Sequence, residues 1–394
     1  MFPRISDLIN YLFGTQLDIP IQSYGLMLAL SFLTAGWILF LELKRKENNG
    51  QTPNQKKKIL KGAPASVTEL ITTGFFGFLL GWKGLGIVLD YSEFRKIPQE
   101  YILSGKGYLL AGVLMAVAFA YLTYSSKKKK GLKPPVWEEH ILHPYQLTGN
   151  IVIIAAIFGI LGSKVFDTIE HMDDLFRDPA GTILSFSGLS FFGGLIVAAI
   201  AVIFYAHKNN IRFPHIIDAA APAIIIAYAI GRIGCQLAGD GCWGVINQYP
   251  KPQWLMFLPD WMWSFTFPHN VVNEGSLIPH CAGDHCYALI NPVFPTSFYE
   301  TILGLIIFFI LWGFRKKLTI PGYLFCLYLI LNGTERFFIE KIRINRVYEV
   351  MGFHMTQAEM IAIGLVILGI LGFWYFRWLQ KTKIDSFSDS KNFK

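Results

Sequence analysis

The chain has 394 residues, of which 53% are hydrophobic and 16% are charged, and its formal net charge is +8. Apolar runs long enough to cross a bilayer recur along its length, which excludes an ordinary soluble domain. The Lys and Arg residues stand in short clusters between these runs, as they do in cytoplasmic loops, so the positive charge indicates membrane orientation and excludes nucleic acid as a partner.

The apolar runs predict an all-α fold, a polytopic transmembrane helical bundle of about nine spans. In chain order we expect them at residues 24–41, 70–89, 108–124, 147–165, 186–204, 216–237, 298–312, 323–338 and 360–378. Basic clusters follow alternate spans, from Lys44, Arg45 and Lys46 to Arg377 and Lys381. The positive-inside rule then puts the N-terminus outside and the C-terminus in the cytoplasm.

The spans and loops predict six segments. They are an outer N-terminal segment with the first span and a cytoplasmic loop (1–65), an extra helical hairpin (66–130), core spans (131–237), an extracytoplasmic loop or small lobe (238–296), C-terminal core spans (297–380) and a cytoplasmic tail (381–394). When the sequence is aligned with itself at an offset of about eighty residues, Gly81 matches Gly162 and Gly112 matches Gly193 without a gap. The extra hairpin is therefore predicted to duplicate residues 147–208.

Charged side chains at membrane depth are costly, so each indicates a partner, a cavity or a function. Arg232 ends the sixth predicted span in Gly-Arg-Ile-Gly-Cys, and Asp240 follows it closely. Arg336 and Glu340 end the eighth span, four residues apart and so on one helical face. The simpler alternatives are an interfacial Arg232 paired with Asp240, and a structural Arg336–Glu340 pair.

The predicted topology brings five separated polar or glycine-rich clusters to the outer membrane level, and such convergence predicts a site. The clusters are Tyr24; residues 190–195 with Gly193 and Gly194; residues 231–244 with Arg232, Cys235, Gly239, Asp240 and Gly244; residues 295–300 with Tyr299 and Glu300; and Arg336 with Glu340.

The five cysteines lack the paired CxxC spacing of a zinc or redox site, so we expect no metal and no cofactor. Cys281 and Cys286 share the polar segment that the topology puts outside, where a disulfide between them is open. Because no short apolar core precedes a cleavage site, we expect no removed signal peptide, and the first span should itself direct insertion.

In this order, the clusters resemble the prolipoprotein diacylglyceryl transferases of bacteria. The motifs that carry the resemblance are Tyr24-Gly25-Leu26, Phe192-Gly193-Gly194-Leu195, Gly231-Arg232-Ile233-Gly234 with Gly239-Asp240 and Trp243-Gly244, residues 295–300, and Arg336-Phe337 with Glu340. They cover the first span and most of the chain from about residue 147. Three positions depart from the family pattern: Phe192 replaces a His, Cys235 an Asn and Asp240 a Glu.

The resemblance implies a bacterial inner-membrane enzyme, facing the outer leaflet, that transfers the diacylglyceryl group of phosphatidylglycerol to the lipobox cysteine in the signal peptide of a prolipoprotein. Besides these substrates, membrane lipids are the expected partners. The implied catalytic residues are Arg232, Arg336, Glu340 and Asp240, and the implied substrate-binding residues are Tyr24, Gly193, Gly194, Cys235, Gly239, Gly244, Tyr299 and Glu300. Because Phe192 neither accepts nor donates a proton, a mechanism that depends on the family His is excluded.

Two alternatives from other classes remain open on sequence alone. A lipid-binding or anion-binding membrane protein, or a transporter without enzymatic activity, would also explain cationic side chains at membrane depth, and duplicated hairpins are common in transporters. Against it, the polar groups gather at one level instead of tracing a path across the bilayer. A different phospholipid-headgroup transferase is the other alternative.

Overall fold

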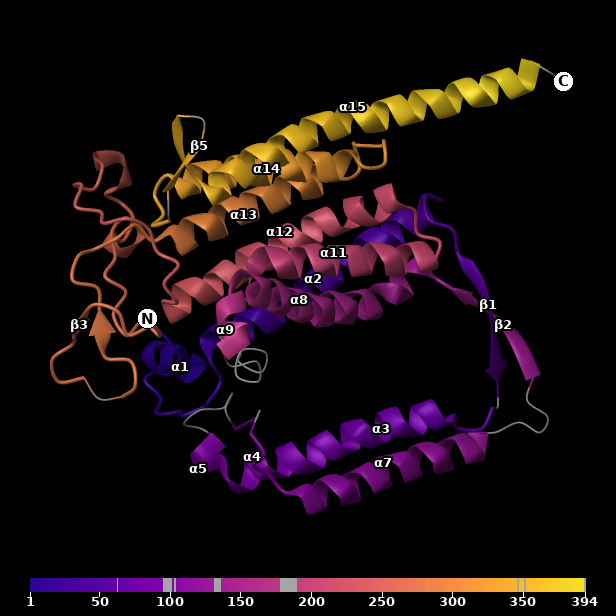
Figure 1. The fold of residues 1–394 in the computed structure, drawn as a ribbon, viewed down its shortest axis with the longest axis horizontal. Helices are drawn as coiled ribbons and strands as arrows, with labels where there is room; N and C mark the ends of the chain where they lie inside the picture. Colours follow the sequence, from indigo (N-terminus) through magenta and orange to yellow (C-terminus); the bar gives the residue numbers. More distant parts are fainter. Residues whose placement is uncertain are drawn as a thin grey trace. The chain divides into compact units, whose positions relative to one another are not determined.

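The structure is a computed structural model that describes residues 1–61, 63–94, 101–102, 104–130, 136–177, 190–281, 283–345, 347–350 and 352–392. These residues form two compact units. The first comprises Met1–Pro3, Ser23–Gln55 and His143–Lys394, and the second comprises Arg4–Gln22 and Lys56–Leu142. Helices predominate in both (Figure 1).

The first unit is a bundle around helix α12. Its helices are α2 (Ser23–Asn48), η2 (Pro144–Leu147), α8 (Thr148–Glu170), α9 (Met172–Arg177), α11 (Phe191–Lys208), α12 (Phe213–Ala238), α13 (Thr296–Phe314), α14 (Tyr323–Glu340) and α15 (Gln357–Asn392). Helix α12 packs against α2 and α13, while α8 packs on α11 and α14 on α15. Buried alanines such as Ala219, Ala221 and Ala229 let neighbouring backbones approach α12 closely.

A small lobe of residues 239–295 connects α12 to α13. It contains the short helices η3 (Gln253–Leu255) and η4 (Asp260–Met262) and the antiparallel strands β3 (Ser276–Leu277) and β4 (Tyr287–Ala288). Trp243, Phe267 and Val293 form its apolar core, and a disulfide joins Cys281 to Cys286. Residues 239–295 therefore pack around a small apolar cluster.

A second hairpin connects α14 to α15. It consists of strands β5 (Val347–Val350) and β6 (Phe353–Thr356), which pair in antiparallel fashion.

The second unit is built on a helical hairpin. Helix α3 (Val67–Leu79) continues through the π-helical turn η1 (Leu80–Gly84) into α4 (Leu85–Leu89), and α7 (Leu109–Lys130) packs against α3 and η1. The remaining elements are α1 (Ile5–Phe13), α5 (Tyr91–Phe94) and a two-stranded sheet of β1 (Gln55–Lys61) and β2 (Val136–Leu142).

The glycines that align in the predicted repeat make the same kind of contact in the two hairpins. A Cβ atom on Gly81 would lie 2.9 Å from the Cα of Gly112, and one on Gly162 would lie 2.6 Å from the carbonyl oxygen of Gly193. The aligned residues 183–185 and 188 lie outside the described residues. The duplication stays a prediction, which this shared close approach supports.

Within the described residues, seven helices are long and apolar enough to cross a membrane. They are Ser23–Asn48, Val67–Leu89, Leu109–Lys129, Pro144–Glu170, Phe213–Ala238, Thr296–Phe314 and Gln357–Thr382, and Phe192–Lys208 is a shorter apolar helix. Every predicted span coincides with a helix, but α11 is short and α14 is not among the seven. Residues 186–189, where the fifth predicted span begins, lie outside the described part of the chain.

Candidate active site

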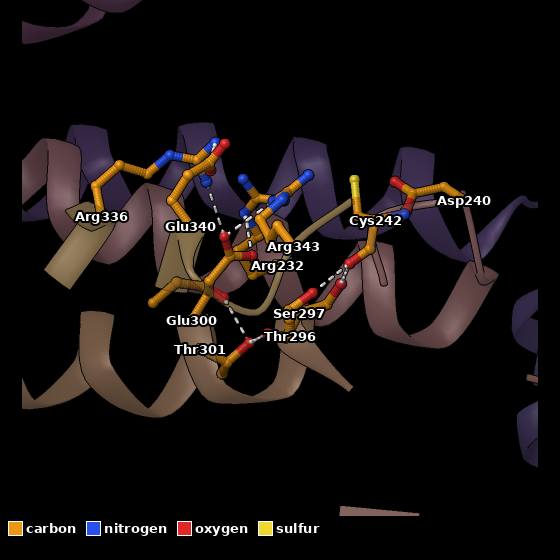
Figure 2. A network of polar contacts seen from close by, with 11 residues as sticks. Arg232, Asp240, Cys242, Thr296, Ser297, Glu300, Thr301, Arg336, Glu340 and Arg343 are labelled. Carbon is orange, nitrogen blue, oxygen red and sulfur yellow. Dashed lines mark hydrogen bonds and ion pairs between the residues drawn. The ribbon is translucent and has the colours of Figure 1, made fainter. Parts of the chain in front are cut away.

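One fully buried carboxylate, Glu300 of α13, lies at the centre of an arginine cluster (Figure 2). The Nε atom of Arg232, from α12, is 3.0 Å from Glu300 Oε2. Arg336 of α14 and Arg343, three residues beyond α14, donate from their Nη1 atoms to Glu300 Oε1 at 3.1 Å and 3.0 Å. Three segments of the chain are therefore tied to a single side chain by charge-assisted contacts.

A second buried carboxylate, Glu340, holds Arg336 from the other side. Arg336 Nη2 is 3.0 Å from Glu340 Oε2, and Asn345 donates from its amide to Glu340 Oε1. The guanidinium of Arg336 is thus fixed between two carboxylates, at the end of the helix that supplies it.

The arginine cluster, defined as Arg232, Arg336 and Arg343 with Glu300 and Glu340, carries a formal charge of about +1. Both carboxylates are fully buried, whereas the arginine side chains keep between 14% and 24% exposure. Burial and the neighbouring Arg232 disfavour the charge of Arg343, but attraction to Glu300 and Cys242 and the hydrogen bond to Glu300 together raise the pKa of Arg343 above its ordinary value. The cluster presents fixed donors that suit an anionic group.

Two glycines of the motif-rich segment after α12 set the position of the cluster. Gly239 ends α12 in the left-handed conformation, with φ of 64°, and its N–H donates to the Cys235 carbonyl at 2.9 Å. Gly244 forms an antiparallel bridge with Arg343, and a Cβ there would lie only 2.4 Å from the carbonyl oxygen of Ile342. The absence of a side chain at Gly244 therefore lets this segment approach the chain that carries Arg343.

The first turn of α13 is bound to the same segment. The hydroxyls of Thr296 and Ser297 both donate to the Cys242 carbonyl oxygen, at 2.8 Å and 2.9 Å (Figure 2). These bonds fix the start of the helix that carries Glu300 and connect it to the segment that leads into the lobe.

Cys235, Asp240 and Cys242 form a second group beside the cluster. Their two sulfur atoms and a carboxylate oxygen lie within 4.8 Å of one another. A hydrogen bond with the Cys235 thiol lowers the pKa of Cys242, burial and Asp240 oppose this shift, and the neighbouring arginines reinforce it. Asp240 thus lies beside two thiols. Arg232 pairs with Glu300, and not with Asp240 as the simpler sequence alternative had it.

The two predicted tyrosines occupy different surroundings. Tyr24, in the first turn of α2, lies against the last turns of α12, because a Cβ on Gly234 would be 3.3 Å from its ring. The hydroxyl of Tyr299 donates to the carbonyl of Met262 at 2.8 Å. Tyr24 therefore borders the site, whereas Tyr299 ties α13 to the lobe.

Gly193 and Gly194 lie in the contact between α11 and α8. A Cβ on Gly193 would be 2.3 Å from that of Phe166, and one on Gly194 would be 2.2 Å from Ser163 Oγ. In the described residues these two glycines serve close helix packing, and the structure does not bring them into the arginine cluster.

The site residues that the resemblance implies do not include Arg343 or Glu335. Arg343 belongs, with Arg336 and Lys341, to a basic group at the outer end of the eighth predicted span, a pattern that predicts phosphate binding. Helix α14 ends at Glu340, however, so the direction of the Arg343 side chain depends on the turn that follows. Glu335 is 6% exposed, and neither carboxylate oxygen is hydrogen-bonded to a described residue. A charge beside Arg336 in an apolar helix was its only signal.

Comparison with known proteins identifies the family. Residues 109–375, well over half of the chain, match the family model for prolipoprotein diacylglyceryl transferase. The chain belongs to this family. All members of the arginine cluster fall within the matched residues.

Curated relatives are similar along most of their length. The phosphatidylglycerol–prolipoprotein diacylglyceryl transferase of Vibrio campbellii is 26% identical over 303 residues, which cover 75% of this chain and 97% of that protein. The enzyme of the same name from Clostridium tetani is 29% identical over 271 residues, which cover 68% of this chain and 91% of that protein. The enzyme of the same name from Dehalococcoides mccartyi is 29% identical over 237 residues, which cover 60% of this chain and 80% of that protein.

Membership of the prolipoprotein diacylglyceryl transferase family confirms that the chain is a multi-pass membrane protein and a transferase. The alternative of a transporter or lipid-binding protein without enzymatic activity is therefore set aside.

Proposed function

We propose that this transferase takes its diacylglyceryl group from phosphatidylglycerol and adds it to the lipobox cysteine of a prolipoprotein signal peptide. The cysteine sulfur attacks the glyceryl carbon that carries the phosphate ester. A C–S thioether bond forms, the C–O bond breaks, and glycerol phosphate leaves. The thiol proton passes to the leaving phosphate or to a protein base.

The arginine cluster is the observation that carries this proposal. Its guanidiniums are held by buried Glu300 and Glu340, so little reorganisation is needed when negative charge develops on the leaving phosphate. Arg232 and Arg336 bind the phosphate in this scheme, and Arg343 joins them. The forked geometry of arginine suits phosphate oxygens better than a point charge does.

Loss of the thiol proton has two candidate acceptors, Glu340 and Asp240. Glu340 is engaged by Arg336 and Asn345, and one oxygen of Asp240 accepts from the Cys242 N–H at 3.2 Å. We propose that the arginines dominate the rate by stabilising the substrate thiolate and the leaving group, and that no single side chain is an indispensable base.

For the membrane we propose nine spans, an outer N-terminus, a cytoplasmic C-terminus and a site that faces the outer leaflet. The lobe with its Cys281–Cys286 disulfide stands on the side of the arginine cluster, as suits an oxidising compartment. At the opposite ends of α2 and α13, Arg45 and Arg315 pair with buried Glu42, as suits a cytoplasmic face.

The test uses purified full-length protein in detergent with phosphatidylglycerol and a lipobox peptide, and mass spectrometry of the peptide. We expect a diacylglyceryl adduct on the cysteine. Arg336→Lys should lose most of the turnover, because it keeps the charge but not the fork, whereas Arg377→Lys, at an exposed position of α15, should keep it.

A folded native protein that makes no adduct would refute the choice of substrates. A product of different mass would instead support another headgroup transferase. Near-normal turnover by Arg336→Lys would refute the role given to the arginine cluster.

A further inference from the structure

The group of Cys235, Asp240 and Cys242 has the composition of a metal site. Its three potential ligand atoms lie within 4.8 Å of one another. Around a tetrahedral zinc ion, bond lengths of about 2.0–2.3 Å place neighbouring ligand atoms roughly 3.5–4 Å apart. Side-chain adjustments of about 1 Å would therefore close the set on an ion.

The backbone holds these ligands in place without an ion. Cys235 is buried in the last turn of α12, and Gly239 turns the chain back in the left-handed conformation. The Cys242 N–H donates to Asp240 at 3.2 Å, and the Cys242 carbonyl accepts from two hydroxyls of α13. Such fixed surroundings lower the entropic cost of gathering ligands.

The chemistry of the set selects the class of ion. Two sulfur ligands favour thiophilic cations such as Zn²⁺ and Cd²⁺ over Ca²⁺ or Mg²⁺, which prefer oxygen. Two thiolates and a carboxylate around a divalent ion carry about −1, which the guanidiniums of Arg232 and Arg343 balance. Three protein ligands also leave one coordination position open.

We propose that Cys235, Asp240 and Cys242 form a binding site for a thiophilic divalent cation, and that an ion bound there inhibits the transferase. The ion would inhibit because its ligands adjoin the residues that position the arginine cluster. Cys235 lies one helical turn after Arg232, and the Cys242 carbonyl binds the first turn of α13, the helix that carries Glu300. That second part rests on the proposed function, but ion binding does not.

The probe is Cd²⁺ alone, added to full-length protein in detergent in which the Cys281–Cys286 disulfide is intact and Cys235 and Cys242 are free thiols, with the ultraviolet charge-transfer band of cadmium thiolates as the readout. We expect one Cd²⁺ per chain, displaced by Zn²⁺ and not by Ca²⁺. Cys235→Ser and Cys242→Ser should lose the band, and Asp240→Asn should bind more weakly. Cys326→Ser is the matched control, because Cys326 is a buried free thiol of α14, and it should bind as the native protein does.

Alkylation tests the site without any substitution. Cd²⁺ should slow the reaction of Cys242 with iodoacetamide in the native protein, as read by peptide mass spectrometry. Absence of the band from protein in which Cys235 and Cys242 are free thiols, or an unchanged band in Cys242→Ser, would each overturn the site.

Zn²⁺ in the transfer assay separates the two parts of the proposal. Inhibition of the native protein and of Cys326→Ser, at Zn²⁺ concentrations that leave the turnover of Cys242→Ser unchanged, supports an inhibitory ion at this site and excludes inhibition through the thiol of the peptide. A cadmium band without any effect on transfer refutes inhibition but leaves the site. A band in a protein that makes no adduct under any condition refutes the proposed function alone.

Discussion

Substitution of Glu300 by Gln tests whether this carboxylate organises the arginine cluster. The change keeps the shape of the side chain but removes a fully buried negative charge that contacts three guanidiniums. The formal charge of the cluster rises from about +1 to about +2. Removing one partner of a buried ion pair typically costs about 3–5 kcal/mol, so we expect Glu300→Gln to lower the free energy of unfolding by at least about 3 kcal/mol.

The effect on turnover should exceed the effect on stability. Misplacement of a catalytic group by about 1 Å costs on the order of 100-fold in rate, and without Glu300 the guanidiniums of Arg232 and Arg343 lose their common anchor. We therefore expect turnover per folded molecule to fall at least about 100-fold. Unfolding is followed by denaturant titration in detergent, and turnover by the mass-spectrometric transfer assay.

Glu42→Gln is the matched control. Glu42 is also fully buried and contacts two arginines, Arg45 and Arg315, but at the far ends of α2 and α13. It should lose a similar free energy of unfolding and keep near-normal turnover per folded molecule. If Glu300→Gln matched the native protein in both assays, or if both variants lost turnover equally, the reasoning would be refuted.

Three further substitutions test the backbone and packing around the site. Gly244→Ala places a Cβ 2.4 Å from the Ile342 carbonyl, so it should displace Arg343 and lower turnover about 100-fold; normal turnover would contradict this. Tyr299→Phe removes the bond to the lobe and should lower the free energy of unfolding by about 1 kcal/mol, a loss that denaturant titration would reveal or exclude. Gly193→Ala should cost about 1–3 kcal/mol in the same titration, because it overpacks the contact between α8 and α11, and unchanged stability would argue against that contact.

Some site residues can be identified from the sequence, because the feature that marks them involves only neighbouring residues. Arg232, Arg336 and Glu340 are charges at the ends of apolar helices, where the cost of burial makes each one conspicuous. Periodicity alone also put Arg336 and Glu340 on one face, and the structure pairs them. The class of fold and the family followed from similarly local evidence.

The surroundings of other residues could not be predicted from the sequence, because their partners lie far along the chain. Glu300, a substrate-binding residue by the resemblance, contacts three arginines from other segments. Tyr299 anchors the lobe, and Gly193 packs against α8, although both belong to motifs that resemble those of the family. A motif fixes the residue type, whereas its neighbours depend on how the helices pack.

Hydrophobic length and charge spacing are properties of contiguous residues, so the amino-acid sequence alone predicts that the chain crosses a membrane as a helical bundle. Three features required the folded structure: Arg343 joins the arginine cluster, Gly244 permits this by its close approach to Ile342, and Cys235, Asp240 and Cys242 lie near one another. These contacts depend on turns after helix ends and on packing between distant segments, and neither is encoded in the periodicity of a single helix.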